Sequence, residues 1–143
     1  DAFDYWHTGH AGSPFPTVWL RFDAKQRAYV VAPELMKKPA PPKNILAELA
    51  DFWKQVGWDG SGGNAVPLPS GGSEQFYKAP WGYALELIYS GNPETAKEYI
   101  YLAWRENKEF ASNQDFWDKF KAELQTSRFY AELSPGLINI NKL

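Results

Sequence analysis

Apolar and polar residues alternate over residues 17–22, and this period of two predicts a β-strand near the N-terminus. Residues 28–32 are also rich in β-prone side chains, and the polar stretch 23–27 between the two segments is typical of a hairpin loop. The first strand has two faces, with Val18, Leu20 and Phe22 on one and Trp19 and Arg21 on the other. Because a two-stranded hairpin alone is marginal in water, we expect this one to pack on helices or to pair elsewhere.

A Pro-rich connection, KKPAPPK, follows at residues 37–43, and we expect it to be stiff and extended. Asn44 is then a candidate N-cap, and Gly57 is a candidate C-terminal stop of a helix. The apolar positions that recur at helical spacing between them are Leu46, Leu49, Ala50, Trp53 and Val56. Residues 59–73 are dense in Gly, Ser and Pro, so they predict a loop or linker and the best boundary between two halves of the chain.

The rest of the chain predicts helices with clear start and stop signals. Pro80 suits the first turn of a short apolar helix that ends at Gly91. Asn92, followed by Pro and Glu, predicts the capped start of a helix of about five turns that reaches Phe110. Ser112, with an aspartate three residues later, resembles a capping box and predicts another helix, with this apolar face: Phe116, Trp117, Phe120 and Leu124.

The C-terminal end is less regular. Phe129, Tyr130 and Leu133 either extend the preceding helix or form a turn, and the Pro-Gly pair at residues 135–136 ends it. Residues 137–140 form a short apolar tail that could add a strand or dock on a partner.

These patterns predict an α+β fold that is mostly α, with a small N-terminal β-hairpin followed by three or four packed helices. We expect residues 1–43 to form an irregular arm, the hairpin and the Pro-rich linker. Residues 44–143 are expected to form the helical domain, with the Gly/Ser/Pro-rich loop at 59–73. The length of 143 residues suits one domain.

Composition and charge exclude several functions. The net charge is −2 and no basic stripe is evident, so we expect no nucleic-acid partner. No apolar run approaches the roughly 20 residues that span a bilayer. The chain has no Cys, which excludes disulfides, thiol catalysis and Cys-based zinc sites. It starts at Asp1, as a mature chain after signal cleavage or a fragment would, and we expect a periplasmic or extracellular location, with a cytoplasmic one as the alternative.

Aromatic residues make up 17% of the chain and include seven Trp, so their placement matters for function. About half of them fall on helical stripes, which favours core packing. The others lie on predicted loops, strand faces or helix edges, where a solvent-facing group would mark a binding surface. These candidate binding residues are Trp6, Trp19, Trp58, Trp81, Tyr77 and Tyr83.

Both histidines lie in the N-terminal arm, where Asp4, His7 and His10 follow one another at a spacing of three. Carboxylate and imidazole suit zinc or copper, but this spacing aligns the ligands only in a helix. Gly9 and Gly12 argue against a helix there, so we favour an irregular arm over a metal site and expect no cofactor. No Ser/His/Asp set or carboxylate pair meets the requirements of acid–base catalysis, so we expect no enzyme activity.

The stretch 84–124 resembles the helical region of TraF-like conjugal-transfer assembly proteins. The residues that carry the resemblance are Asn92-Pro93-Glu94-Thr95, Lys97, Tyr99, Leu102, Ala111-Ser112, Asp115, Trp117 and Leu124. In that family an Asn-Pro start opens a long helix, and a helix with an aspartate and a tryptophan follows. The family's thioredoxin-like domain and any Cys-x-x-Cys are missing here, so the resemblance implies a periplasmic scaffold role without redox activity.

These observations favour a non-enzymatic interaction or assembly protein that binds another protein through the arm, the hairpin or the tail. The resemblance implies a place in a periplasmic secretion, conjugation or pilus machine. Two alternatives are a small-ligand or carbohydrate-binding module that uses the loop aromatics, and a metalloprotein that uses the His-containing arm.

Overall fold

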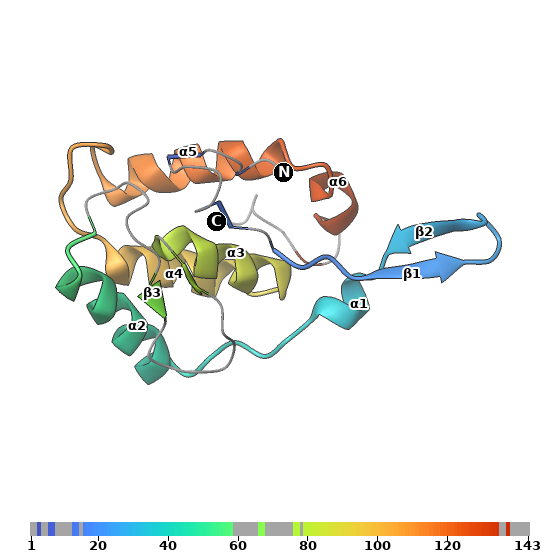
Figure 1. The fold of residues 1–143 in the computed structure, drawn as a ribbon, viewed down its shortest axis with the longest axis horizontal. Helices are drawn as coiled ribbons and strands as arrows, with labels where there is room; N and C mark the ends of the chain where they lie inside the picture. Colours follow the sequence, from blue (N-terminus) through green and yellow to red (C-terminus); the bar gives the residue numbers. More distant parts are fainter. Residues whose placement is uncertain are drawn as a thin grey trace.

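The computed structural model describes residues 3, 6, 7, 13, 14, 16–58, 66, 67, 76, 77, 79–134 and 137. A two-stranded hairpin precedes a set of packed helices (Figure 1), which confirms the predicted α+β, mostly α fold. The elements in chain order are β1 (Leu20–Asp23), β2 (Ala28–Val31), α1 (Pro33–Met36), α2 (Lys43–Gln55), β3 (Val66–Pro67), β4 (Phe76–Tyr77), α3 (Pro80–Tyr89), α4 (Pro93–Ala103), α5 (Asn113–Gln125) and α6 (Tyr130–Leu133).

The hairpin forms where the alternating pattern predicted it. Strands β1 and β2 pair antiparallel, with Leu20 opposite Val31 at the base of the hairpin. Asp23 shapes the turn, because its Oδ1 accepts hydrogen bonds from the backbone N–H groups of Lys25 at 2.8 Å and Gln26 at 3.1 Å. An aspartate that bonds its own backbone in this way is a common turn former, so a local polar contact closes the hairpin.

Glycines end α2 and α3, as the sequence predicted. Gly57 has a φ of +71° and Gly91 a φ of +85°, a region that glycine enters at no steric cost. Backbone hydrogen bonds from Gly91 to Ile88 and from Asn92 to Leu87 close the end of α3. The same pair of bonds closes α2 after Gly57, so both helices end in a Schellman motif.

The predicted caps of α2 and α4 are wrong. Helix α2 begins at Lys43 after Pro42, so Asn44 lies inside the first turn. Asn92 does precede α4, but its side chain makes no capping hydrogen bond. Its Nδ2 donates to the carbonyl oxygen of Lys38 at 3.0 Å and to Ser90 instead. The side chain therefore holds the Pro-rich linker against the α3–α4 turn.

Helix α4 is shorter than the five turns predicted. It ends at Ala103, and Trp104 is already extended, with φ −60° and ψ 138°. After this end, the Oδ1 of Asn107 accepts hydrogen bonds from the backbone N–H groups of Glu109 and Phe110. A side chain that satisfies backbone donors in this way competes with the helix, so the apolar repeat up to Phe110 continues through a loop.

The cap of α5 is confirmed. The Oγ of Ser112 accepts a hydrogen bond from the backbone N–H of Asp115 at 3.0 Å. The Asp115 carboxylate reaches back to the backbone N–H of Ala111, one residue before the cap. Aspartate thus performs the reciprocal role that Glu or Gln usually takes in a capping box.

Three short elements were not predicted from the sequence. Helix α1 lies between β2 and the Pro-rich linker, and strand β3 lies within the predicted loop 59–73. Strand β4 pairs antiparallel with β3, with Val66 opposite Tyr77. The other residues of that loop lie outside the described part of the chain. Helix α6 takes the place of the predicted extension or turn after α5.

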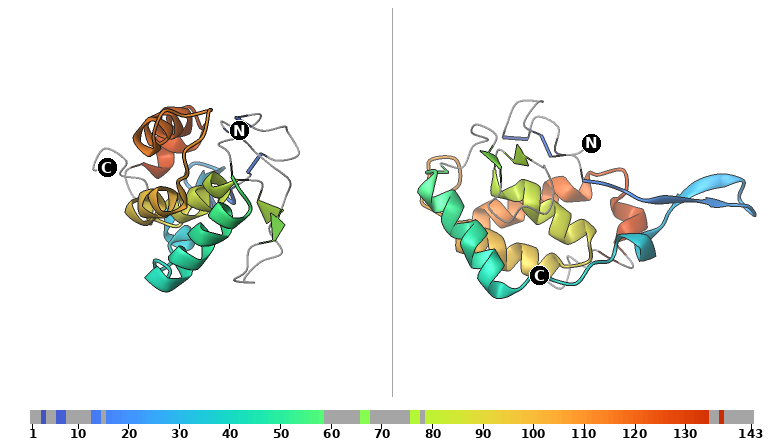
Figure 2. Two further views of the ribbon diagram at one scale, coloured as in Figure 1. Left: turned by 90° about the vertical axis from the view of Figure 1, so that its left-hand side faces the viewer. Right: turned by 60° about the horizontal axis from the view of Figure 1, so that its bottom comes forward.

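The core forms where α2, α3, α4 and α5 pack together (Figures 1 and 2). Helix α4 joins the set, because it packs against α2, α3 and α5, and most of the ten residues of α3 are buried. A buried hydrogen bond of 2.6 Å from Trp53 Nε1 to the Tyr99 hydroxyl joins α2 to α4. Paired polar groups are tolerated in a core while unpaired ones are costly, so this contact also specifies how the two helices meet.

Candidate functional site

The hairpin projects from the helices at one end of the molecule (Figure 1), and a second view shows the same projection (Figure 2). Its strands pair extensively with each other and with no helix to a comparable extent. The expectation that the hairpin packs on the helices therefore holds only at its base, and the alternative, that it pairs elsewhere, stays open.

Large apolar side chains are exposed on this projection. In the described part of the chain, the exposed large apolar side chains of the hairpin and α1 are Trp19, Leu20, Phe22, Tyr29 and Leu35. Val56 and Leu102 are also exposed, but Val56 follows α2 and Leu102 lies on α4. Scattered single apolar residues on a surface are ordinary, whereas a contiguous group marks an interaction site. The hairpin carries such a group.

The ladder places three of these side chains, those of Leu20, Phe22 and Tyr29, on one face of the hairpin. Phe22 lies opposite Tyr29, and their rings meet edge to face with centroids 5.6 Å apart. Leu20 belongs to the same face, two residues before Phe22. Phe22 is 58% exposed and Tyr29 is 72% exposed, so their mutual contact leaves most of both rings in water.

The base of the hairpin is fixed to the body. Met36 is buried in the core, and the backbone N–H of Ala32 donates to the Trp19 carbonyl at 2.8 Å. The backbone N–H of Lys38 donates to the Ser90 carbonyl at 3.1 Å, which ties the linker to the end of α3. The hairpin thus projects from an anchored base and has an exposed tip, and it is distinct from the N-terminal arm.

A small cavity of about 150 Å³ opens beside this base. Trp19 and Met36 line it from the hairpin side, Lys38 lines it from the linker, and Glu86 and Tyr89 line it from α3. The cavity therefore joins an exposed ring to a lysine and a carboxylate. It has room for a side chain.

The candidate binding aromatics do not form one surface. Trp19 is exposed, as its prediction requires, but Trp58 and Trp81 are buried and belong to the core. Trp6 and Tyr83 are half-buried and pack against that core. A buried ring cannot offer its face to a ligand, so the idea of a loop-aromatic surface is wrong for Trp58 and Trp81. The side chain of Tyr77 lies outside the described part of the structure.

Three of the six off-stripe rings, Trp6, Trp58 and Trp81, instead meet in an aromatic cluster. Trp6 contacts Trp81 at 5.4 Å and Phe116 at 5.7 Å between ring centroids. Trp58 contacts the same two rings, each at 5.9 Å. Edge-to-face pairs of this kind add about 0.5–1.5 kcal/mol each beyond the burial of area. The cluster explains much of the aromatic excess as structure.

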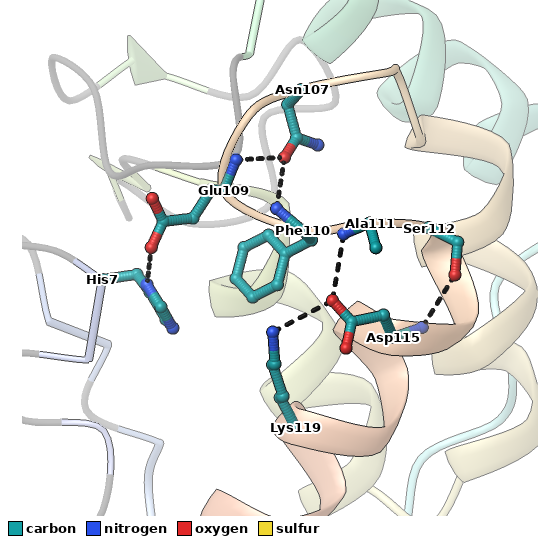
Figure 3. Close-up of polar contacts among 8 residues, drawn as sticks. All are labelled: His7, Asn107, Glu109, Phe110, Ala111, Ser112, Asp115 and Lys119. Carbon is teal, nitrogen blue, oxygen red and sulfur yellow. Dashed lines mark hydrogen bonds and ion pairs between the residues drawn. The ribbon is translucent and has the colours of Figure 1, made fainter.

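His7 ties the arm to the loop after α4 (Figure 3). Its Nδ1 lies 2.6 Å from Oε1 of Glu109, and its ring meets Phe110 with centroids 4.8 Å apart. The Lys119 ammonium lies 5.3 Å from the centre of the same Phe110 ring. The geometry gives His7 a structural contact with a carboxylate.

This arrangement does not support the hypothesis of a metal site formed by Asp4, His7 and His10. Asp4 and His10 lie outside the described residues, so their relation to His7 is open. Within the described part, no three or more His, Asp or Glu side chains gather as metal ligands would.

Several titratable groups have pKa values shifted by their surroundings, and the shifts of Tyr99 and Asp115 show the structural causes. Burial raises the pKa of Tyr99 well above its ordinary value, although the hydrogen bond from Trp53 opposes the shift. The Lys119 ammonium and the Ala111 N–H, as hydrogen-bond donors, hold the pKa of Asp115 below its usual range. Strongly shifted groups often mark functional sites, but here one belongs to the core and the other to a helix cap.

Sequence reasoning missed Leu20, Phe22, Tyr29 and Leu35 as candidate binding residues. It singled out Trp and Tyr residues on loops, strand faces and helix edges, and it expected the hairpin to pack on helices or to pair elsewhere. The available signal was apolar residues on both faces of a two-stranded hairpin, since Trp19 lies opposite the Leu20 face. A hairpin with two apolar faces cannot bury both on one set of helices.

The chain matches no protein-family model, no curated protein and no solved structure. The resemblance to TraF-like proteins therefore stays a prediction. Several of its residues have structural roles here, because Tyr99, Trp117 and Leu124 are fully buried. Over the described residues, no helix is both long and apolar enough to cross a bilayer.

Proposed function

We propose that this protein is a non-enzymatic interaction module that binds another protein through its projecting hairpin. The observation that carries the proposal is the exposed apolar face of Leu20, Phe22 and Tyr29, held away from the helices on an anchored base. Aromatic side chains on an exposed, well-positioned element are frequent anchors of protein interfaces. The proposal extends to a periplasmic secretion, conjugation or pilus machine, and that extension rests on the helical resemblance alone.

The contrast between the two ends of the molecule supports this proposal. Aromatic rings in the helical body pack on one another, whereas the rings of Phe22 and Tyr29 contact little apart from each other. An isolated two-stranded hairpin is marginal in water. A partner that covers this face would remove apolar area from water and stabilise the hairpin at the same time.

Co-fractionation in the cells that make the protein tests the proposal. An extract is separated by size, and the tagged chain is compared with the Phe22→Thr/Tyr29→Thr variant and with Leu102→Thr as a matched control. Leu102 is an exposed apolar residue on α4, away from the hairpin. We expect the unchanged chain and the control in a larger complex, and the hairpin variant at the size of the free protein. Identical elution of all three would refute the proposal.

A further inference from the structure

Strand β1 is exposed along most of its length, since only Asp23 is half-buried. Residues 19–22 are four consecutive exposed positions, whereas β2 runs into the buried Val31 at the base. An exposed strand edge presents N–H and C=O groups that can pair with another chain. The two edges of this hairpin therefore differ, and β1 has the one that is open to an additional strand.

The register shows which backbone groups point outward from β1. The hydrogen bond from Ala32 to Trp19 makes these two residues a hydrogen-bonded pair of the antiparallel ladder. Such pairs alternate with non-hydrogen-bonded ones, so Leu20 and Phe22 belong to the second kind. Their N–H and C=O groups point away from β2, and their side chains form the exposed apolar face. Backbone and side chains of the same two residues are thus both available to a partner.

Charge distinguishes this region from the rest of the chain. Residues 16–43 hold six Lys and Arg against two acidic residues, which gives +4, and the whole chain carries −2. The remainder therefore carries −6, from nine basic and fifteen acidic residues. A basic arm on an acidic protein favours an acidic partner and accelerates its association.

Several of these cations have no carboxylate partner. Arg21 pairs with Glu34 at 3.1 Å between exposed side chains, and Lys43 pairs with Glu98. Over the described residues, the basic side chains of this region that form no ion pair are Lys25, Arg27, Lys37 and Lys38. Lys25 and Arg27 lie in the turn between β1 and β2, whereas Lys37 and Lys38 follow α1, and Lys38 lines the cavity beside Trp19 at the base of the hairpin. Positive charge thus stands at both ends of the open edge.

We propose that β1 takes up an extended, acidic segment of a partner protein as an additional antiparallel strand. This inference rests on the proposed function and names the chemistry of the partner. Residues of the segment opposite Leu20 and Phe22 form hydrogen-bonded pairs with them and place apolar side chains on the same face. The residues between them carry the acidic side chains. Main-chain bonds supply affinity and the alternate side chains supply specificity in this mode of recognition.

A peptide titration tests the chemistry of the segment. The probe is a fluorescein-labelled acetyl-Glu-Val-Glu-Val-Glu-Val amide, measured by fluorescence anisotropy with the full chain. We expect saturable binding that weakens with salt, and no binding when each Glu is replaced by Lys. N-methylation at the Val residues should abolish binding, because their N–H groups face β1. N-methylation at the Glu residues should leave it within about threefold, because those groups face away. Equal effects of the two methylations would overturn strand addition.

A matched pair of protein variants tests which edge is used. Phe22→Pro and Tyr29→Pro each remove one ring of the same cross-strand pair, and each removes an N–H that points out of the hairpin. Proline is tolerated where an edge N–H faces solvent. We expect Phe22→Pro to weaken peptide binding by at least about tenfold and Tyr29→Pro by much less. NMR shifts of Val31 at the hairpin base report whether each variant keeps the hairpin. The methylated peptides test strand addition on the unchanged protein, so that result does not depend on whether a variant folds. Equal losses in two folded variants would overturn the choice of β1.

The same preparation tests other occupants. Vesicles of phosphatidylglycerol and phosphatidylcholine, single-stranded DNA, and sedimentation equilibrium of the chain alone cover a lipid surface, a nucleic acid and a second copy. The proposal of an acidic segment would be overturned by tighter binding to the vesicles or to the DNA than to the peptide. Self-association that Phe22→Pro abolishes would overturn it as well. If co-fractionation depends on the hairpin while the peptide results fail, the proposed function stands and strand addition is wrong. If both fail, the hairpin is no binding arm.

Discussion

Removing the Phe22 ring should cost the folded protein little, because the ring serves a partner more than the core. Phe22 is 58% exposed, so less than half of its area is buried. Full burial of such a side chain contributes about 1.5–3 kcal/mol, which leaves roughly 1 kcal/mol for this partial burial. The edge-to-face contact with Tyr29 adds about 0.5–1.5 kcal/mol.

Most of that loss stays within the hairpin, because β1 and β2 have few contacts with the helices. For Phe22→Thr we therefore expect the free energy of unfolding of the helical body to fall by less than about 1 kcal/mol. Phe120→Ala is the matched control. Phe120 is fully buried and stacks on both Phe116 and Trp117, so its loss should cost about 3–5 kcal/mol.

Urea unfolding followed by circular dichroism at the helical minimum measures both values. The helices supply this signal, so the assay reports the body and leaves out local fraying of the hairpin. A loss for Phe22→Thr as large as that for Phe120→Ala would refute the reasoning. It would mean that the hairpin belongs to the cooperative core and that its exposed face serves stability.

Three further predictions concern the helical body. Tyr99→Phe should lower the free energy of unfolding by about 1–3 kcal/mol at pH 7, because it leaves Trp53 Nε1 buried without its acceptor. The folded state keeps the Tyr99 proton while the unfolded chain releases it, so the free energy of unfolding should fall as pH rises above about 10. Urea titrations across this pH range should show a smaller fall for Tyr99→Phe than for the unchanged protein. Ser112→Ala should cost about 0.5–2 kcal/mol through loss of the α5 cap, and an unchanged urea midpoint would contradict that role. Gly91→Ala should cost more than Gly57→Ala in thermal unfolding: both have positive φ, but the new Cβ would lie 3.0 Å from a Leu137 methyl at the first and 3.7 Å from an Arg105 nitrogen at the second.

Features set by local chemistry could be predicted from the sequence. The ends of α2 and α3 follow from Gly57 and Gly91, since only glycine adopts a positive φ without strain. The turn of the hairpin follows from a polar stretch that can bond its own backbone, as Asp23 does. These signals act over a few residues, so the fold class followed from them.

Features set by distant contacts could not be predicted. The side chain of Asn92 does not cap α4 but donates a hydrogen bond to the carbonyl oxygen of Lys38, which is 54 positions away in the sequence. Trp58 and Trp81 were candidates for a surface because they lie off the helical stripes, yet they meet each other in the core. Only the packing of whole elements decides such placements, so sequence periodicity alone misassigned them.

Only part of the candidate site could be predicted, because the packing of whole elements also decides which of its side chains are exposed. Trp19 was identified from its residue type, and the hairpin from its pattern. The exposure of Leu20 and Phe22 depends on where the helices lie, and an alternating pattern does not specify whether its apolar face meets a core or a partner.

Site-specific photocrosslinking in living cells tests the central claim most directly. A benzoylphenylalanine introduced at Phe22 is compared with the same group at Leu102, an exposed apolar position on α4. The account predicts a discrete crosslink to another protein from position 22 and none from position 102. Crosslinks of equal strength from both positions, or none from position 22, would contradict the claim that the hairpin is the binding arm.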